Sequence, residues 1–277
     1  MSYLYSDTGI FGSALSAAAS YVFLFILFGS FLERLGGGQV FIDLATGTAG
    51  GTRGGPAKVA VVASALFGTI SGSSVANVAG TGTFTIPLMK KIGYKSRFAA
   101  GVEAAASSGG QIMPPVMGST AFILAEIVGV TYSVLAFKAL VPAVLYFLAI
   151  FIMVDLEAVM MGLKGVSKDL LPDAKKVFRE KWAYLLPIVV IFFMLLVLKT
   201  STSRAAIVGI LATLIGPLFF ARGTKVSTKK LVDSVQGGAM GVLNIIASCS
   251  SAGIIIGILA MTGLGLKVGT LLVKLSQ

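Results

Sequence analysis

The chain has 277 residues, of which 56% are hydrophobic and 12% are charged, and its formal net charge is +11. This composition argues against a soluble globular domain and indicates an all-α membrane protein, a polytopic helical bundle. Histidine is absent and Cys249 is the single cysteine, so no intrachain disulfide, cofactor or histidine-based enzyme site is predicted. The basic residues lie in short loops between apolar segments, which favours a role in membrane topology and lipid contact over binding to nucleic acid.

The N-terminal part of the chain contains one predicted span and one segment that is too polar to cross. The span runs from Ala14 to Leu32 and ends at Glu33 and Arg34. The segment from Gln39 to Gly55 is rich in glycine and polar residues. We expect an interfacial helix there.

Residues 56–91 predict a re-entrant hairpin. Its first apolar stretch, Val59 to Ile70, would span about 18 Å as a helix, whereas the hydrocarbon core of a bilayer is about 30 Å thick. Basic residues flank both ends of the hairpin, at Lys58 and Lys90, which favours the cytoplasmic side for both. The polar run Ser71 to Gly82 would form a tip next to protein or a water-filled cavity. The alternative is one continuous helix whose small residues allow a neighbouring helix to approach closely.

The next crossing, residues 97–127, is predicted to be a broken helix. Two glycines precede Pro114 and Pro115, and proline removes helix hydrogen bonds. We therefore expect two half-helices with unwound backbone from Ser107 to Pro115. Further spans are predicted over 133–154, 182–198, 205–220 and 238–261, followed by an apolar segment over 264–277.

The distribution of charge gives a topology. The loops 90–97, 164–181 and 222–230 are rich in Lys and Arg, and we assign them to the cytoplasmic side. The loop 128–132 has no basic residue and 199–204 has two, so these loops are assigned to the outside. The N-terminus then lies outside.

A recurring pattern suggests internal symmetry. Spans that close on glycines occur at 21–38 and 245–265, with flanking charges that place them in opposite orientations. This suggests two inverted repeats. We expect residues 1–154 to form the first repeat, 155–181 a cytoplasmic amphipathic connection, and 182–277 connecting spans and the start of a second repeat.

The hairpin tip and the broken helix contain the candidate site. Broken helices in inverted-repeat transporters offer carbonyls to cations and helix N-termini to anions. Neutral oxygens suit sodium and do not repel an anionic substrate. The candidate sodium ligands are Ser71, Gly72, Ser73, Ser74, Asn77, Ser107, Ser108, Gly109 and Gly110, and the candidate substrate contacts are Gln111, Pro114 and Pro115. As alternatives, the serines could bond back to helix carbonyls and the asparagine could bridge two helices.

Glu103 is the only acid inside an apolar segment and away from its ends, which makes it a functional candidate. Its alternative is a charge pair with a basic residue near the cytoplasmic face, and we favour that alternative. No metal site other than sodium is predicted.

Four motifs resemble the large membrane subunit of TRAP transporters, in particular the fused permeases that work with TAXI-type binding proteins. They are Gly54–Ser64, Ile70–Asn77, Ile92–Tyr94 and Ala104–Pro115. The resemblance implies a sodium-driven symporter of the bacterial inner membrane that imports organic acids such as C4 or C5 dicarboxylates. It also implies a periplasmic TAXI-type binding protein and a small TRAP membrane subunit, or its fused equivalent, as partners. The family's second hairpin would lie beyond this chain, together with the second sodium site and half of the substrate site.

Two alternatives remain open at this point. The first is a sodium-coupled symporter for divalent anions that uses no binding protein. The second is a membrane assembly subunit without a transport cycle of its own. An integral membrane enzyme ranks last, because no histidine, cysteine pair or acidic cluster occurs in the sequence.

Overall fold

The computed structural model describes residues 6, 9–167, 169, 171–220, 227–264, 267, 268, 270 and 274. Every regular element among these residues is helical, which confirms the all-α prediction. The predictions for the loop 222–230 and the apolar segment 264–277 lie largely outside the described residues.

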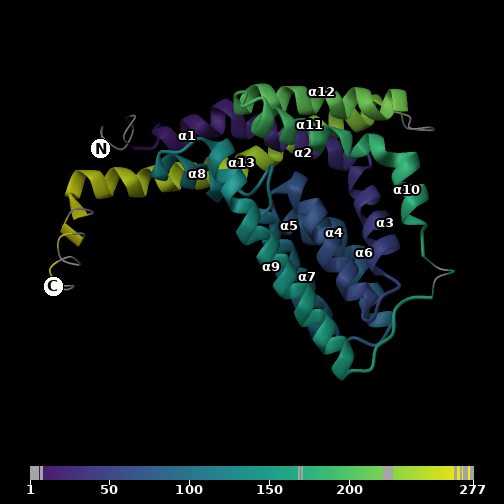
Figure 1. The fold of residues 1–277 in the computed structure, drawn as a ribbon. Coiled ribbons are helices and arrows are strands. Elements are labelled where there is room, and N and C mark those ends of the chain that lie inside the picture. The colour runs from purple at the N-terminus through teal and green to yellow at the C-terminus, as the bar shows by residue number, and fades with distance from the viewer. Residues whose placement is uncertain are drawn as a thin grey trace.

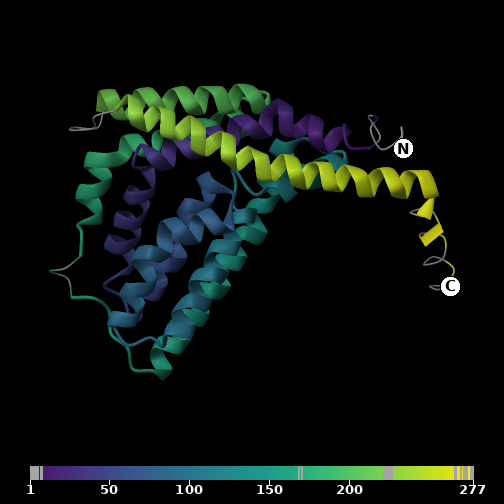
Figure 2. The same cartoon turned by 180° about the vertical axis from the view of Figure 1, so that it is seen from behind.

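The helices form two groups (Figures 1 and 2). We call the first group the transverse layer; its helices lie side by side across one end of the molecule. Its members are α1 (Ser13–Ala17), α2 (Phe23–Arg34), α11 (Leu186–Phe192), α12 (Thr202–Phe220) and α13 (Thr228–Thr262). Helix α2 packs between α12 and α13.

We call the second group the hairpin group; it projects away from the transverse layer (Figure 1). Its members are α3 (Gly37–Ala49), α4 (Gly55–Ser71), α5 (Ser74–Asn77), α6 (Thr83–Lys91), α7 (Ser96–Gly109) and α9 (Tyr132–Met160). Helix α8 (Ser119–Val128) lies where the two groups meet, and α10 (Ala174–Lys181) leads back to the layer.

Three helices among the described residues are long and apolar enough to cross a membrane, namely Leu15–Arg34, Tyr132–Met160 and Thr228–Thr262. They confirm the spans predicted over 14–32, 133–154 and 238–261. The span predicted over 182–198 is interrupted near its start, because a bend of 62° separates Ala174–Tyr184 from Leu186–Val197. These helices support a multi-pass membrane protein.

Residues 55–91 form a helical hairpin whose tip is shorter than expected, and its re-entrant course in the membrane stays a prediction. Helix α4 begins after Gly54 and ends before Gly72, and both glycines are in the left-handed conformation, with φ of 63° and 56°. The turn involves only Ser71 to Ser73, and the return arm starts at Ser74. The run to Gly82 is helical; one face of it, at Asn77, Thr81 and Gly82, is buried, whereas Val75 and Ala79 are exposed.

The segment predicted as an interfacial helix over 39–55 is helix α3, which packs along α4. Its buried face includes Phe41 and Ala45.

The connection predicted over 155–181 begins later than expected, because α9 continues to Met160. Asp155 lies inside this helix and forms ion pairs with Arg53 at 2.5 Å and Lys58 at 2.6 Å. These two cations neutralise the carboxylate, so the acid does not end the helix. Helix α10 is the charged helix expected in this connection, and Asp173 accepts a bond from the Lys175 amide at its start.

Candidate functional site

The hairpin tip, Ser71–Ser74, contacts the break in the interrupted helix, which spans Met113–Gly118. A Cβ built on Gly72 would lie 2.0 Å from the Met117 carbonyl oxygen, and one on Gly118 would lie 3.1 Å from the Gly72 oxygen. The two irregular segments therefore meet backbone to backbone. Only a residue without a side chain fits at Gly72, where φ is also positive.

The break begins later than predicted. Helix α7 continues through Ser107 and Ser108 to Gly109, and one 3₁₀ turn, Gly110–Ile112, follows it. Ser108 donates to the Ala104 carbonyl at 2.8 Å, a local bond that is compatible with the helix. The residue before a proline is biased toward extended backbone, and Met113 adopts it with ψ of 114°.

Tyr132 at the start of α9 fixes the unwound backbone. Its hydroxyl lies 2.6 Å from the Pro115 carbonyl oxygen and 2.8 Å from that of Val116, to which it donates. Its ring stacks on Phe122 of α8, with ring centroids 4.4 Å apart. The buried carbonyls of the break therefore have a hydroxyl donor.

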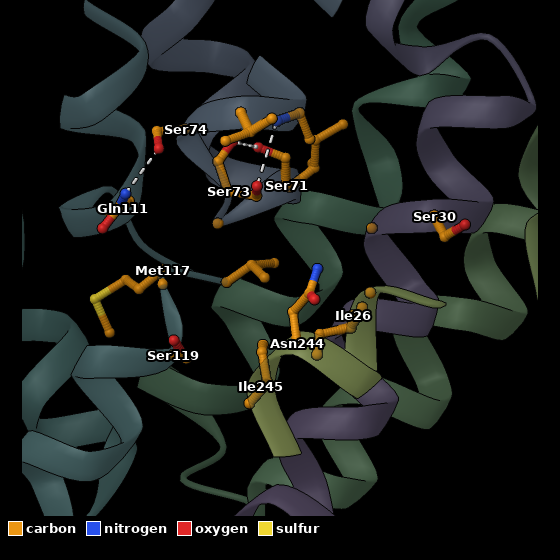
Figure 3. Close-up of a pocket in the computed structure, with 18 of the residues that line it drawn as sticks. Ile26, Ser30, Ser71, Ser73, Ser74, Gln111, Met117, Ser119, Asn244 and Ile245 are labelled. Atoms are coloured by element: carbon orange, nitrogen blue, oxygen red, sulfur yellow. Dashed lines mark hydrogen bonds between the residues drawn. The ribbon is translucent and has the colours of Figure 1, made fainter. Parts of the chain in front are cut away.

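A cavity of about 630 Å³ lies between the tip, the break and the transverse layer (Figure 3). Five predicted site residues line it: Ser71, Gly72, Ser73, Ser74 and Gln111. Gln111 donates to the Ser74 hydroxyl at 2.9 Å, and Ser73 accepts from the Ala76 amide at 3.3 Å. The predicted residues of the tip and of the break therefore lie together at this cavity.

Helix termini add partial charges to this cavity. Helix α4 ends at Ser71, which lines it, so the negative end of that helix dipole lies there. Helix α8 begins at Ser119, which also lines it and adds a positive end. A cation and an anion can both find favourable electrostatics in this cavity.

The transverse layer contributes residues that sequence reasoning missed. Asn244 and Ser248 of α13 and Ser30 and Arg34 of α2 line the cavity. Figure 3 shows the Asn244 amide pointing into the space below the tip. The available signal was an asparagine inside an otherwise apolar span, since such residues in membrane helices usually meet a polar partner.

The other predicted site residues do not line this cavity. They are Asn77, Ser107, Ser108, Gly109, Gly110, Pro114 and Pro115. The two glycines allow close packing instead. A Cβ on Gly110 would lie 3.0 Å from the Gly68 Cα, and one on Gly109 would lie 2.5 Å from the Tyr146 ring. Pro114 and Pro115 are buried in the break.

Two of these residues belong to a separate, fully buried set of polar side chains that we call the buried cluster. Its members are Ser64, Asn77, Thr81, Thr85, Glu103 and Ser107, and none of them has exposed surface. Glu103 accepts from Ser107 at 3.3 Å, from Thr85 at 2.5 Å and from Thr81. The charge pair favoured for Glu103 is therefore wrong, because hydroxyls surround the carboxylate in place of a basic residue.

Among the described residues, no three His, Cys, Asp or Glu side chains group as ligands for a metal ion. The cavity instead offers neutral oxygens together with the Glu33 carboxylate and the Arg34 guanidinium, and the buried cluster offers neutral oxygens with one carboxylate. Such donor sets suit hard cations of low charge.

Residues 6–277 match the family model described as the DctM component of the tripartite ATP-independent periplasmic transporter. The chain belongs to this family. It is thus a large permease chain of the TRAP transporters, which confirms the family resemblance; the TAXI-type and fused-permease details remain predictions.

Curated relatives carry related names. The chain is 29% identical over 207 residues to the C4-dicarboxylate TRAP transporter large permease protein DctM of Pseudomonas aeruginosa, covering 73% of this chain and 47% of the relative. It is 30% identical over 195 residues to the isethionate TRAP transporter permease protein DctMQ of Oleidesulfovibrio alaskensis, covering 69% and 30%. It is 30% identical over 219 residues to DctM of Vibrio cholerae, covering 76% and 48%. The chain spans about half the length of the DctM relatives.

Proposed function

We propose that this chain forms part of the transport pathway of a sodium-coupled permease that imports organic acids across the bacterial inner membrane. The substrates would be of the C4 or C5 dicarboxylate class, and a periplasmic binding protein would deliver them. A TAXI-type binding protein and a small membrane subunit, or its fused equivalent, would be the partners.

One observation carries the proposal: a hairpin tip and a broken helix meet at one cavity, with a helix C-terminus at Ser71 and a helix N-terminus at Ser119. Secondary transporters use this combination to bind a cation and an anionic group near the membrane midplane. Arg34 lines the same cavity and adds a positive charge beside Glu33.

The names of the relatives support an anionic substrate, since they mention C4-dicarboxylates and isethionate. These compounds differ in their acidic group. The cavity residues named above would recognise negative charge through dipoles and hydroxyls, which fits several small organic acids.

The test is uptake by the permease at its full natural length, reconstituted in liposomes with its partner subunits. A labelled C4 dicarboxylate is supplied with the binding protein, and inward gradients of sodium, potassium or protons are imposed in turn. We expect accumulation with the sodium gradient. Ser74→Ala should raise the sodium concentration for half-maximal uptake by about threefold to tenfold, because one oxygen at the tip is lost.

Ser251→Ala is the matched control. Ser251 lies on α13, donates to the Ala247 carbonyl at 2.9 Å and does not line the cavity. The sodium dependence of uptake by this variant should equal that of the wild type. Equal uptake on a proton gradient with sodium removed would refute the proposed coupling.

A further inference from the structure

A second cavity, of about 820 Å³, lies where the start of α9 meets residues 195–202. We call it the lysine cavity, because Lys138 and Lys199 line it. It shares no lining residue with the cavity at the hairpin tip. Its volume is in the range of ligand-binding pockets, and the proposed transport function gives it no role.

The lysine cavity is positively charged. Its lining residues include two lysines and neither aspartate nor glutamate. Neither lysine belongs to an ion pair among the described side chains, whose pairs are Arg53–Asp155, Lys58–Asp155 and Lys181–Asp43. Helices α9 and α12 also begin at this cavity, so the positive ends of their dipoles add to the lysine charges. The cavity therefore favours an anion.

Lys199 has a backbone conformation that usually requires glycine. Its φ is 49°, in the left-handed region, and it follows the helical segment that ends at Val197. The amide and the hydroxyl of Thr200 both donate to the Met194 carbonyl, each at 3.0 Å, and close this segment. Glycine adopts such a conformation without steric cost, whereas lysine is strained there. The positive charge at this position is thus accompanied by a backbone cost.

One rim of the lysine cavity is apolar and exposed. Val134 and Phe137 of α9 line the cavity, and 44% and 60% of their surfaces are exposed. Val197, next to the lining residue Leu196, is 63% exposed. A small dissolved anion would gain nothing from this apolar surface, whereas an anion that carries acyl chains would cover it.

The position of the cavity along α9 also favours a lipid. Helix α9 is long and apolar enough to cross a membrane, and its first two turns line the cavity. The end of a spanning helix lies at the level of the lipid headgroups. The hydroxyls of Ser133, Ser201 and Thr202 lie along the same cavity and are donors for phosphate oxygens. Basic pockets between membrane helices are known to bind anionic headgroups.

The lysine cavity is connected to the broken helix through Tyr132. This residue lines the cavity and is only 3% exposed, and its hydroxyl donates to the Pro115 and Val116 carbonyls of the break. Tyr21 also lines the cavity, and its ring centroid lies 6.3 Å from that of Tyr132. A molecule in the cavity therefore packs against the residue that supports the break.

We propose that the lysine cavity binds the headgroup of an anionic phospholipid. Lys138 and Lys199 contact the phosphate, and the acyl chains lie along Val134 and Phe137. The bound lipid restricts the movement of Tyr132 and so stabilises the break. This inference depends neither on sodium coupling nor on the identity of the transported substrate.

The test uses the permease at its full natural length with its partner subunits, delipidated in detergent. Thermal unfolding is followed during titration with dioctanoyl phosphatidylglycerol. Dioctanoyl phosphatidylcholine is the reference for the same chains without net charge, and glycerol phosphate is the reference for the headgroup without chains. We expect a saturable rise of the unfolding midpoint with phosphatidylglycerol alone, because both the charge and the chains contribute to binding.

Lys138→Gln and Lys199→Gln should each weaken the apparent affinity for phosphatidylglycerol about fivefold, and the double variant by more than tenfold. Arg204→Gln is the matched control, because Arg204 is exposed close to the same loop but does not line the cavity. It should keep the wild-type affinity. Lys199→Gly removes the charge and the backbone strain together, so it should bind lipid as weakly as Lys199→Gln while its lipid-free midpoint does not fall.

Three outcomes would overturn the inference. Equal stabilisation by phosphatidylcholine would mean that apolar contact alone explains binding. Equal stabilisation by glycerol phosphate would make the cavity a site for small anions. Unchanged affinity in the double lysine variant would place the lipid elsewhere. If that variant also lost uptake that depends on the binding protein, the lysines would instead belong to a protein-docking surface.

Discussion

The tip and the buried cluster belong to the same hairpin, yet their surroundings differ completely. Ser73 at the tip is exposed and Ser71 and Ser74 are half-buried, whereas Asn77, only three residues further on, has no exposed surface. The tip makes few and weak bonds, such as Ser71 to the Ser73 carbonyl at 3.4 Å. In the cluster, by contrast, four hydroxyls donate to the Glu103 carboxylate.

This difference separates two tasks. A site that exchanges its ligand in every transport cycle needs an opening and side chains that can rearrange, as at the tip. A closed, strongly bonded cluster holds α4, the return arm and α7 together and so sets the shape of the hairpin. Substitutions at the tip should therefore act through the fit of the backbone, and substitutions in the cluster through the side-chain groups that they remove.

Gly72→Ala should have the largest effect on the tip. The new Cβ would meet the Met117 carbonyl at 2.0 Å, and the left-handed φ of 56° adds strain. We expect about 1–2 kcal/mol from the backbone and about 1–3 kcal/mol from the clash, with uptake abolished. Thermal unfolding in detergent measures the loss of stability, and uptake in liposomes measures the loss of transport.

Gly162→Ala is the control for this substitution. Gly162 has φ of 64°, and a Cβ there would meet nothing within 4 Å. It should show only the backbone cost and keep its uptake. If both alanine variants lost the same stability and uptake, the contact between tip and break would not matter.

Tyr132→Phe should have an intermediate effect, because it tests the support of the break. Removing the hydroxyl leaves the buried Pro115 and Val116 carbonyls without their donor. We expect a loss of about 1–3 kcal/mol in stability and a higher substrate concentration for half-maximal uptake.

Tyr146→Phe provides the comparison for that loss. The Tyr146 hydroxyl also donates to a backbone carbonyl, at 2.9 Å, but the acceptor is Ala105 within helix α7. A regular helix does not need this donor to keep its shape. Identical substrate dependence in the two phenylalanine variants would mean that the break keeps its geometry without Tyr132.

The sequence predicted the hairpin and the broken helix, because arm length, flanking charge and prolines are local signals. Three spans followed from continuous apolar stretches for the same reason. The ends of the irregular segments were less accurate: Ser107 and Ser108 are helical, and their hydroxyls bond within α7. The division into inverted repeats stays a prediction.

The site was predicted in part, and its failures share a cause. The sequence places Asn77 next to the tip and Ser107 and Gly110 next to the break, but helix packing decides which way each one faces. Asn77 faces α4 in the interior, and Gly110 lies against Gly68. Asn244 is far away in sequence, so only the packing of α13 beside α2 could reveal its position in the cavity.

The smallest effect is expected from the contact between Gln111 and Ser74, which joins the break to the tip across 2.9 Å at an exposed position. Water competes for both groups, so the bond contributes only about 0.5 kcal/mol to stability. A double-mutant cycle with Gln111→Ala, Ser74→Ala and the combined variant measures this coupling from unfolding midpoints. The coupling energy of the two substitutions should be larger when it is calculated from the half-saturating sodium concentration of uptake than from stability. The reason is that a bound ion orders both side chains and excludes water. Strictly additive effects of the two substitutions on the sodium dependence would show that tip and break bind the ion independently.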